Sequence, residues 1–382
     1  MQFDSPMRRQ VFSLPQLMRD QYADLEPKAR KLLTTPEIFS IQRIVLTGCG
    51  DSYAAALATK HIFELLTNIP TEVVTALDLA RYYHPKQVGF APLNPLVIAV
   101  SNSGGVARIS EAVQFANEHG AFTVGITGNE GSPLGQNAKR IFKLDIPAFE
   151  SAPGVRSYMV SVLSLLLLAI RIGEVRGVYT MDQAMAYRLD MLKQADLLEQ
   201  MLPAMDEAVY QVAEQWKDFP CFDFVGAGFD YATAFYGHAK ILEATGRNAM
   251  RINSEEWLHL NVFARDVSHI GTVMVANTTN PAISRAKETL RLAAELGRPL
   301  MVVTDGDAAD FGVAAAYVRV PNSASQINMP LTQFVPTALL AADIAAMIGE
   351  SYGRGCEGPW KICTGGAGVR NSEIKIRKNV LG

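Results

Sequence analysis

The stretch GCGDSYAAA at Gly48–Ala56 returns in altered form as GAGFDYATA at Gly226–Ala234, and five of the nine aligned positions are identical. Each copy follows an apolar, β-prone run and opens an alanine-rich segment. This order predicts a strand, a tight glycine turn and the first turn of a helix. Such a junction presents backbone N–H groups and the positive end of a helix dipole, which suits an anion such as a phosphate.

The duplication continues downstream of both glycine turns. The apolar run before Ser101-Asn102-Ser103 lines up with the run before Thr278-Thr279-Asn280, and in both copies a helix and another apolar run follow. Continuous apolarity is typical of parallel strands that helices cover on both faces. The sequence therefore predicts an α/β protein with two doubly wound parallel sheets, each with its ligand at the carboxyl ends of the strands.

Composition limits the function classes. The 382 residues are 49% hydrophobic and 19% charged, enough to bury two ordinary cores. A net charge of −3 without a Lys/Arg cluster argues against nucleic acid or an anionic membrane as partner. Met1–Asp20 lacks a signal-peptide core, and the apolar run Met159–Ile170 is too short to span a bilayer, so we expect it to be a buried helix. Four cysteines without paired C-x-x-C spacing indicate reduced thiols in a cytoplasmic protein. A zinc site at Cys356 and Cys363 is disfavoured because no second ligand pair with metal spacing accompanies them, and we expect no metal and no cofactor.

These patterns divide the chain into five parts. We expect a helical arm over residues 1–35, a first sheet domain over 36–175, a helical connection over 176–217 that is interrupted at Pro203, a second sheet domain over 218–350, and an irregular tail over 351–382.

The polar turns of the first copy have the chemistry of an anion site. Ser101-Asn102-Ser103-Gly104 supplies two hydroxyls, an amide and a close backbone approach, and Ser52 follows Gly50 in the neighbouring junction. A helix cap would explain one of these serines, whereas a phosphate site would explain them together. In the second copy Asp230 would repel an anion, so we expect only the first copy to hold phosphate.

The glycine turns, the Ser-x-Ser-Gly turn and the duplication together resemble the tandem SIS (sugar isomerase) domains of glutamine:fructose-6-phosphate amidotransferases, of fructosamine-6-phosphate deglycases and of amino-sugar-phosphate deaminases. The resemblance covers nearly the whole chain. It implies two SIS domains and a phosphorylated sugar bound by the first. The residues that it would assign to phosphate and sugar are Gly50, Ser52, Ser101, Asn102, Ser103, Gly104 and Ser157.

The same resemblance implies a set of catalytic residues. Lys240, Glu243 and His259 fall on the family's Lys, Glu and His, and Lys378 matches its lysine near the C-terminus. Lys240 and Glu243 would share one face of a helix, near its N-terminal end. In such enzymes a carboxylate moves a proton between C1 and C2 of the sugar, the role expected of Glu243. His259 would open the sugar ring, and Lys240 would neutralise developing charge. Lys378 would either form a Schiff base with the open-chain carbonyl or assist ring opening.

Departures from the family pattern limit the choice of reaction. The chain begins without the glutaminase domain of the amidotransferases, so glutamine is not expected as a direct nitrogen donor. The family's Ser-Gln-Ser-Gly-Glu-Thr turn ends here in Gly104-Gly105-Val106, which removes one phosphate-binding hydroxyl. Arg156 and Tyr158, which flank Ser157, also differ from the family, and we expect them to reach another substituent of the substrate, such as a carboxylate.

The sequence thus predicts a metal-independent, cytoplasmic enzyme that acts on a 6-phosphorylated keto or amino sugar by deglycation, deamination or isomerisation. A non-catalytic sugar-phosphate-binding protein and an ammonia-using subunit that makes glucosamine 6-phosphate remain as alternatives. The resemblance further implies a homodimer, in which His259 serves either its own or the neighbouring subunit's site.

Overall fold

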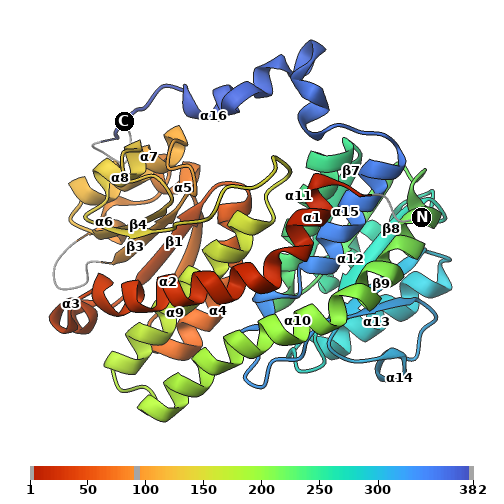
Figure 1. Cartoon of the computed structure of the whole chain (residues 1–382), viewed down its shortest axis with the longest axis horizontal. Coiled ribbons are helices and arrows are strands. Elements are labelled where there is room, and N and C mark those ends of the chain that lie inside the picture. The colour runs from red at the N-terminus through yellow and green to blue at the C-terminus, as the bar shows by residue number, and fades with distance from the viewer. Residues whose placement is uncertain (1–3, 90–94, 378–382) are drawn as a thin grey trace. The chain divides into compact units, whose positions relative to one another are not determined.

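The computed structural model describes residues 4–89 and 95–377 and divides into two compact units, each built around one sheet (Figure 1). The first-sheet unit consists of Met18–Ala148, Ser157–Leu189 and Cys356–Gly382. The second-sheet unit consists of Met1–Leu17, Phe149–Arg156 and Asp190–Gly355. Each unit is described by itself below.

The first sheet has five parallel strands in the order β2-β1-β3-β4-β5. Its strands are β1 (Ile44–Gly48), β2 (Thr71–Thr75), β3 (Leu96–Val100), β4 (Phe122–Thr127) and β5 (Arg140–Lys143). Every residue of β1 and β3 is buried, as continuous apolar strands covered on both faces require. The strand order reverses between β1 and β3, and their carboxyl ends are therefore the expected place for a ligand.

The second sheet repeats this topology with the order β10-β9-β8-β6-β7, again all parallel. Its strands are β6 (Cys221–Val225), β7 (Asn248–Ile252), β8 (Ile270–Val275), β9 (Leu300–Thr304) and β10 (Ala316–Arg319). Counted from the first strand of each sheet, both orders are 2-1-3-4-5. The prediction of two parallel sheets flanked by helices is confirmed.

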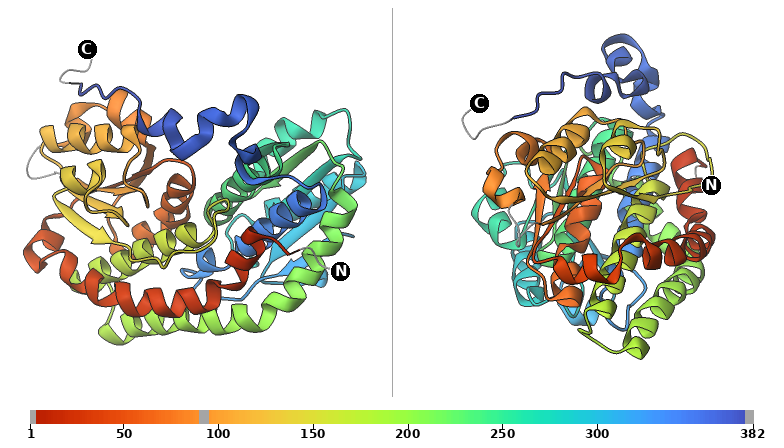
Figure 2. Two further views of the ribbon diagram at one scale, coloured as in Figure 1. Left: turned by 45° about the horizontal axis from the view of Figure 1, so that its top comes forward. Right: turned by 90° about the vertical axis from the view of Figure 1, so that its left-hand side faces the viewer.

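Helices flank the strands of each unit (Figure 2). Those of the first-sheet unit are α3 (Thr35–Ser40), α4 (Asp51–Thr67), α5 (Ala76–Arg81), α6 (Pro85–Val88), α7 (Ala107–Glu118), α8 (Pro133–Asn137), η5 (Gly358–Gly366) and α16 (Ala367–Arg370). Those of the second-sheet unit are α1 (Pro6–Phe12), η1 (Gly228–Asp230), α11 (Tyr231–Thr245), α12 (Ser254–His259), η2 (Asn261–Phe263), α13 (Ile283–Glu295), α14 (Ala308–Phe311), η3 (Met329–Leu331), α15 (Val335–Met347) and η4 (Tyr352–Cys356). The helices α2 (Leu14–Leu32), α9 (Arg156–Val175) and α10 (Met181–Trp216) contribute residues to both units.

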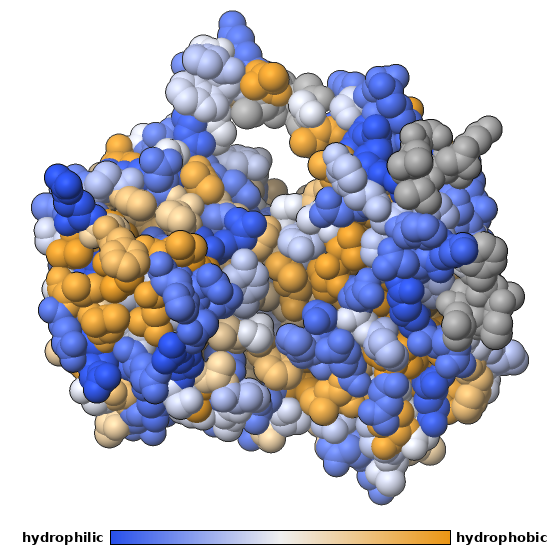
Figure 3. All heavy atoms as spheres, turned by 180° about the vertical axis from the view of Figure 1, so that it is seen from behind, coloured by the Kyte–Doolittle hydropathy of each residue, from blue (hydrophilic) through white to orange (hydrophobic). Residues whose placement is uncertain are grey.

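Two long apolar helical stretches belong to the buried interior. By length and composition alone, Arg156–Val175 and Met329–Met347 could cross a membrane, but 83% and 89% of their apolar windows are buried within the molecule. The expectation of a buried helix over residues 159–170 is therefore confirmed. On the face shown in Figure 3, apolar patches lie among hydrophilic residues.

The expected interruption of the connecting helix at Pro203 is wrong. The helix α10 runs without a break from Met181 to Trp216 with Pro203 inside it. A proline in a helix removes one backbone hydrogen bond. Leu202 and Met205, on either side of Pro203, are both buried, so the packed face of α10 continues past the proline.

Candidate functional site

The glycine turn after β1 has the geometry that the sequence predicts. A Cβ atom on Gly48 would lie 2.5 Å from the backbone of Ser52, so the first turn of α4 packs directly on this glycine. Gly50 has a φ of +55° and precedes α4 without a side-chain cap. Ser52 is half-buried in the first turn of α4. The turn thus places a hydroxyl beside an uncapped helix N-terminus.

The turn after β3 is fixed to the end of the neighbouring strand β4. Gly104 has a φ of +64°, and a Cβ atom there would lie 1.9 Å from Ser132 Oγ. The N–H of Gly104 donates to the carbonyl of Ser101 at 2.9 Å, and the carbonyl of Asn102 accepts from the N–H of Gly128 at 2.9 Å. Only glycine fits at position 104, because both the backbone conformation and the packing exclude a side chain.

The two turns are neighbours because β1 pairs with β3, with Thr47 opposite Ala99. Ser101 is buried, Ser103 is half-buried and Asn102 is exposed. The hydroxyl of Ser103 accepts the N–H of Gly105 at 3.4 Å. The structure therefore gathers the predicted hydroxyls and glycines of the first copy at the reversal point of the first sheet.

The sequence argument missed the hydroxyls that support this turn from β4. Thr127 Oγ1 donates to the carbonyl of Asn102 at 3.2 Å, and Ser132 Oγ donates to the carbonyl of Asn129 at 2.6 Å next to Gly104. In the sequence, the sign of this support was Thr127, the polar residue that ends the apolar run Thr123–Thr127.

Ser157 lies half-buried at the start of α9, where its carbonyl accepts the hydroxyl of Ser161 at 2.8 Å. Next to it, burial and then the nearby Asp51 carboxylate raise the pKa of Tyr158. Because Asp51 begins α4, this interaction places the start of α9 beside the glycine turn after β1.

The expectation that Arg156 and Tyr158 reach a substituent of the substrate is not supported. Tyr158 is only 1% exposed. Arg156 is 8% exposed, donates to Ser13 Oγ at 2.8 Å and lies 4.4 Å from the ring centroid of Phe149. Both side chains pack within the protein, because the loop before α9 turns them inward.

The glycine turn after β6 matches the turn after β1 in geometry. Gly228 has a φ of +55°, the same as Gly50, and a Cβ atom on Gly226 would lie 2.7 Å from the backbone of Asp230. The expected alignment of the turn after β3 with the turn after β8 is wrong, because the strand register pairs other residues. Val225 lies opposite Met274, so the residue that corresponds to Ser101 is Ala276 rather than Thr278.

Asp230 occupies the position of Ser52 and is fully buried within a cluster of donors. Its carboxylate accepts the backbone N–H of Asn277 at 3.0 Å and the side-chain amides of Asn277, Asn280 and Gln333 at 2.5, 2.8 and 2.7 Å. Burial raises the pKa of Asp230 to about 6, although these hydrogen bonds act to lower it. The small pocket beside Asp230 has no room for a water molecule. The protein's own carboxylate thus fills the anion position of the second sheet.

The candidate catalytic residues Lys240 and Glu243 form an ion pair on α11, with Lys240 Nζ 2.7 Å from Glu243 Oε2. Lys240 is fully buried, and its Nζ lies 5.0 Å from the ring centroid of Tyr236. The hydroxyl of Tyr236 donates to the carbonyl of Gly154 at 2.9 Å. The expected place of the pair near the start of the helix is wrong, because α11 begins at Tyr231 and the pair lies in its last two turns.

His259 is the last residue of α12 and is exposed. Its Nε2 lies 3.1 Å from Glu255 Oε1, so its hydrogen-bond partner is Glu255 rather than Glu243. The buried Trp257 anchors the helix by donating from its indole N–H to Asp223 at 3.1 Å. Lys378 lies outside the described residues.

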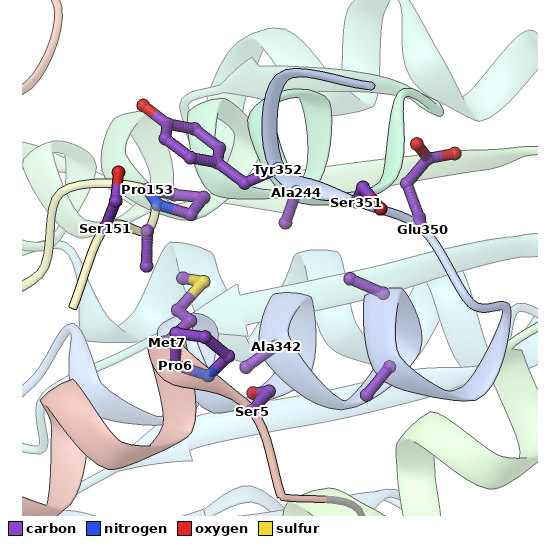
Figure 4. Close-up of a pocket in the computed structure, with 13 residues that line it drawn as sticks. Ser5, Pro6, Met7, Ser151, Pro153, Ala244, Ala342, Glu350, Ser351 and Tyr352 are labelled. Carbon is purple, nitrogen blue, oxygen red and sulfur yellow. The ribbon is translucent and has the colours of Figure 1, made fainter. Parts of the chain in front are cut away.

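A cavity of about 320 Å³ in the second-sheet unit adjoins Ala244, the residue after Glu243 (Figure 4). Tyr236, Lys240 and Ala244 follow one another at helical spacing, so the cavity continues the face of α11 that carries the lysine. The lining is mainly apolar. It consists of Ser5, Pro6, Met7, Ser151, Ala152, Pro153, Ala244, Ala342, Ala345, Ala346, Glu350, Ser351 and Tyr352.

Comparisons with known proteins agree with this fold. A Thermus thermophilus glutamine–fructose-6-phosphate aminotransferase is 25% identical over 311 residues, which are 81% of this chain and 50% of that protein. The chain thus spans about half the length of the curated relatives it matches.

Two solved structures share the fold. The C-terminal domain of the Francisella tularensis glucosamine-fructose-6-phosphate aminotransferase superposes with a TM-score of 0.79 at 17% identity, over 91% of this chain and 97% of that chain. The Escherichia coli tagatose-6-phosphate ketose/aldose isomerase does so with a TM-score of 0.73 at 16% identity, over 91% and 95%. Residues 37–171, which hold both turns of the first candidate site, match the SIS domain family, and the chain is homologous to the isomerase half of the glutamine–fructose-6-phosphate aminotransferases.

Proposed function

We propose that the protein is an enzyme with two tandem SIS domains that acts on a 6-phosphorylated keto or amino sugar through an enediol or enolamine. The observation that carries this proposal is the cluster of hydroxyls and glycines at the reversal point of the first sheet, inside the stretch that matches the SIS domain. The homology to the isomerase half of the aminotransferases supports the class of substrate.

The phosphate of the sugar would bind to the two turns of the first sheet. Ser52, Ser101 and Ser103 offer hydroxyls, and a phosphate could approach the backbone at Gly50 and Gly104 closely, because both have a positive φ and no side chain. The uncapped N-terminus of α4 adds the positive end of a helix dipole. Asn102 and Ser157 would then contact the sugar.

Glu243 would transfer the proton between C1 and C2. Removing a proton from one carbon gives the enediol or enolamine, and returning it to the other carbon completes the rearrangement. The buried ammonium of Lys240, which is held 2.7 Å from the half-buried carboxylate of Glu243, would stabilise negative charge on the intermediate. His259 would protonate the ring oxygen, and Lys378 would bind the open-chain carbonyl.

Two reactions of an amine-bearing substrate fit this scheme, deglycation and deamination. In deglycation the proton moves from C1 to C2 of a 1-amino ketose, which leaves an imine at C1. Water hydrolyses this imine to the aldose phosphate and the free amine. In deamination the proton moves from C2 to C1 of a 2-amino aldose, and hydrolysis of the imine at C2 releases ammonia and the ketose phosphate.

We also propose that the enzyme is a cytoplasmic homodimer. Leu260 and Phe263, which follow His259, are 61% and 81% exposed, as expected of residues that a second subunit covers. A concentration series in analytical ultracentrifugation checks the dimer. A monomer at every concentration would contradict it.

A substrate panel tests the proposed function. The purified protein is incubated with fructose 6-phosphate, glucosamine 6-phosphate and phosphorylated 1-amino ketoses, and the products are assayed for aldose phosphate, ammonia and free amine. We expect one class to be consumed. A sugar phosphate that raises the melting temperature without being consumed would favour the non-catalytic binding protein, and glucosamine 6-phosphate formed only with added ammonia would favour the synthase subunit. If no 6-phosphosugar binds or reacts, the proposed function is wrong.

A further inference from the structure

The segment of residues 371–377, which follows α16, lies along α7 in the first-sheet unit (Figure 1). Arg108 donates to Ser372 Oγ at 2.9 Å and to the carbonyl of Glu373. Further on, Arg377 donates to the carbonyl of Tyr83. These contacts, which lie far apart in sequence, hold the segment beside the helix that follows the Ser101–Gly105 turn.

Arg370, at the start of this segment, lies directly against that turn. A Cβ atom on Gly105 would be 3.6 Å from Arg370 Cδ and 3.8 Å from Arg370 Nε. The side chain of Arg370 is exposed, and no residue within 4–89 or 95–377 forms an ion pair with it. The nearby Arg108 differs in this respect, because it pairs with the buried carboxylate of Glu111. Arg370 is thus a cation at the edge of the candidate phosphate site that forms no ion pair with any residue the structure describes.

The local sequence fits this arrangement. The pattern Ser-x-Ser-Gly continues here with Gly105 and Val106, where the resembling family has Glu and Thr. A glutamate at position 105 would bring a side chain into the space of Arg370 and would offer it an internal ion pair. The change at position 106 removes a hydroxyl from the phosphate site. Compared with the family pattern, the turn therefore lacks one phosphate-binding hydroxyl. Next to the same turn lies a guanidinium that forms no ion pair with the described residues.

We infer that Arg370 binds the phosphate group of the substrate and replaces the contact that the turn has lost at Val106. This inference rests on the proposed sugar-phosphate function. A guanidinium donates paired hydrogen bonds that match phosphate oxygens, and it stays charged at all physiological pH values. The long, exposed side chain needs only a change of rotamer to turn its donors toward the turn.

The test compares Arg370→Ala with Lys375→Ala in the full-length protein. Lys375 carries the same charge on the same segment but pairs with Glu373 at 3.1 Å. Calorimetric titration with fructose 6-phosphate should show about 10-fold weaker binding for R370A and less than 2-fold for K375A. Binding of unphosphorylated fructose should not differ among the three proteins. Adding Val106→Thr to R370A should recover about 3-fold in affinity.

The outcomes separate this inference from the proposed function. If wild-type protein binds no 6-phosphosugar, the proposed function fails first. If wild-type protein binds and R370A binds within 2-fold of it, or if K375A loses as much as R370A, Arg370 is not a phosphate ligand. A V106T/R370A protein that binds no better than R370A would contradict the replacement of one contact by the other.

Discussion

The reversal points of the two sheets share a backbone and differ in what fills them. In both, a glycine without room for a Cβ atom ends the first strand, and a second glycine has a φ of +55°. Two residues after this second glycine, the first sheet has Ser52 and the second sheet has Asp230. Donors surround Asp230 on several sides, whereas the matching position of the first sheet carries the hydroxyl of Ser52, which follows the carboxylate of Asp51 in the chain.

This difference suits the proposed function, in which the first-sheet unit binds the phosphate and the second-sheet unit carries the catalytic residues. A parallel sheet with uncapped helix N-termini attracts negative charge at its reversal point. In the proposed function the first sheet binds an external anion at that position, whereas in the second sheet the buried carboxylate of Asp230 occupies it and accepts hydrogen bonds from the turn. The chemistry that we propose for the second-sheet unit then rests on the far end of α11, at Lys240 and Glu243.

The largest effect is expected from Glu243→Gln, which tests this division of roles. The amide keeps the shape of the side chain but cannot accept a proton, so turnover of the best panel substrate should fall by about 10²- to 10⁴-fold. Binding of the sugar phosphate should stay within about 2-fold, because phosphate recognition is assigned to the other sheet. Glu295→Gln on α13 serves as control, since Glu295 is an exposed residue of the same unit. Turnover that survives in E243Q would remove Glu243 from the mechanism.

Ser52→Asp tests the comparison itself, because it gives the first sheet the residue of the second. A carboxylate at position 52 would occupy or repel the anion position, and affinity for fructose 6-phosphate should fall at least about 100-fold. Ser52→Ala removes one hydrogen bond only and should lose about 5-fold. Calorimetric titration measures both. Equal affinities for S52D and wild type would show that phosphate binds elsewhere.

Much of the fold could be predicted from the sequence because both sheets leave strong local signals. The glycines at 48, 50, 226 and 228 are required by close packing or by positive φ, and the buried parallel strands are continuous apolar runs. The gathering of Ser52, Ser101 and Ser103 also followed, since strand order alone brings their turns together.

The rest depended on packing that no local pattern shows. The register of β8 against β6 decides that Ala276, rather than Thr278, corresponds to Ser101. The direction in which the loop before α9 turns decides that Arg156 contacts Ser13. The fate of Asp230 depends on Gln333, which lies 103 residues away in sequence. A single sequence gives no sign that such distant residues meet.

The smallest effect concerns the pH dependence that the internal carboxylate should produce. Asp230 has a pKa of about 6 in the folded protein against 3.8 for an ordinary aspartate, so as the pH rises between these values the unfolded chain releases its proton first. The free energy of unfolding should therefore fall by about 1 to 3 kcal/mol as the pH rises from about 4 to about 6. Asp230→Asn should be less stable throughout, because its single oxygen cannot accept from all the donors, but its curve should lack this slope. Asp343, with a pKa raised to about 7 by burial, adds a slope of the same sign to both proteins, so their difference isolates Asp230.

Urea unfolding followed by the fluorescence of Trp216 and Trp257, which both lie in the second-sheet unit, measures the two curves. Parallel curves for wild type and D230N would mean that the carboxylate is ionised at pH 4 and that the donors around it outweigh its burial.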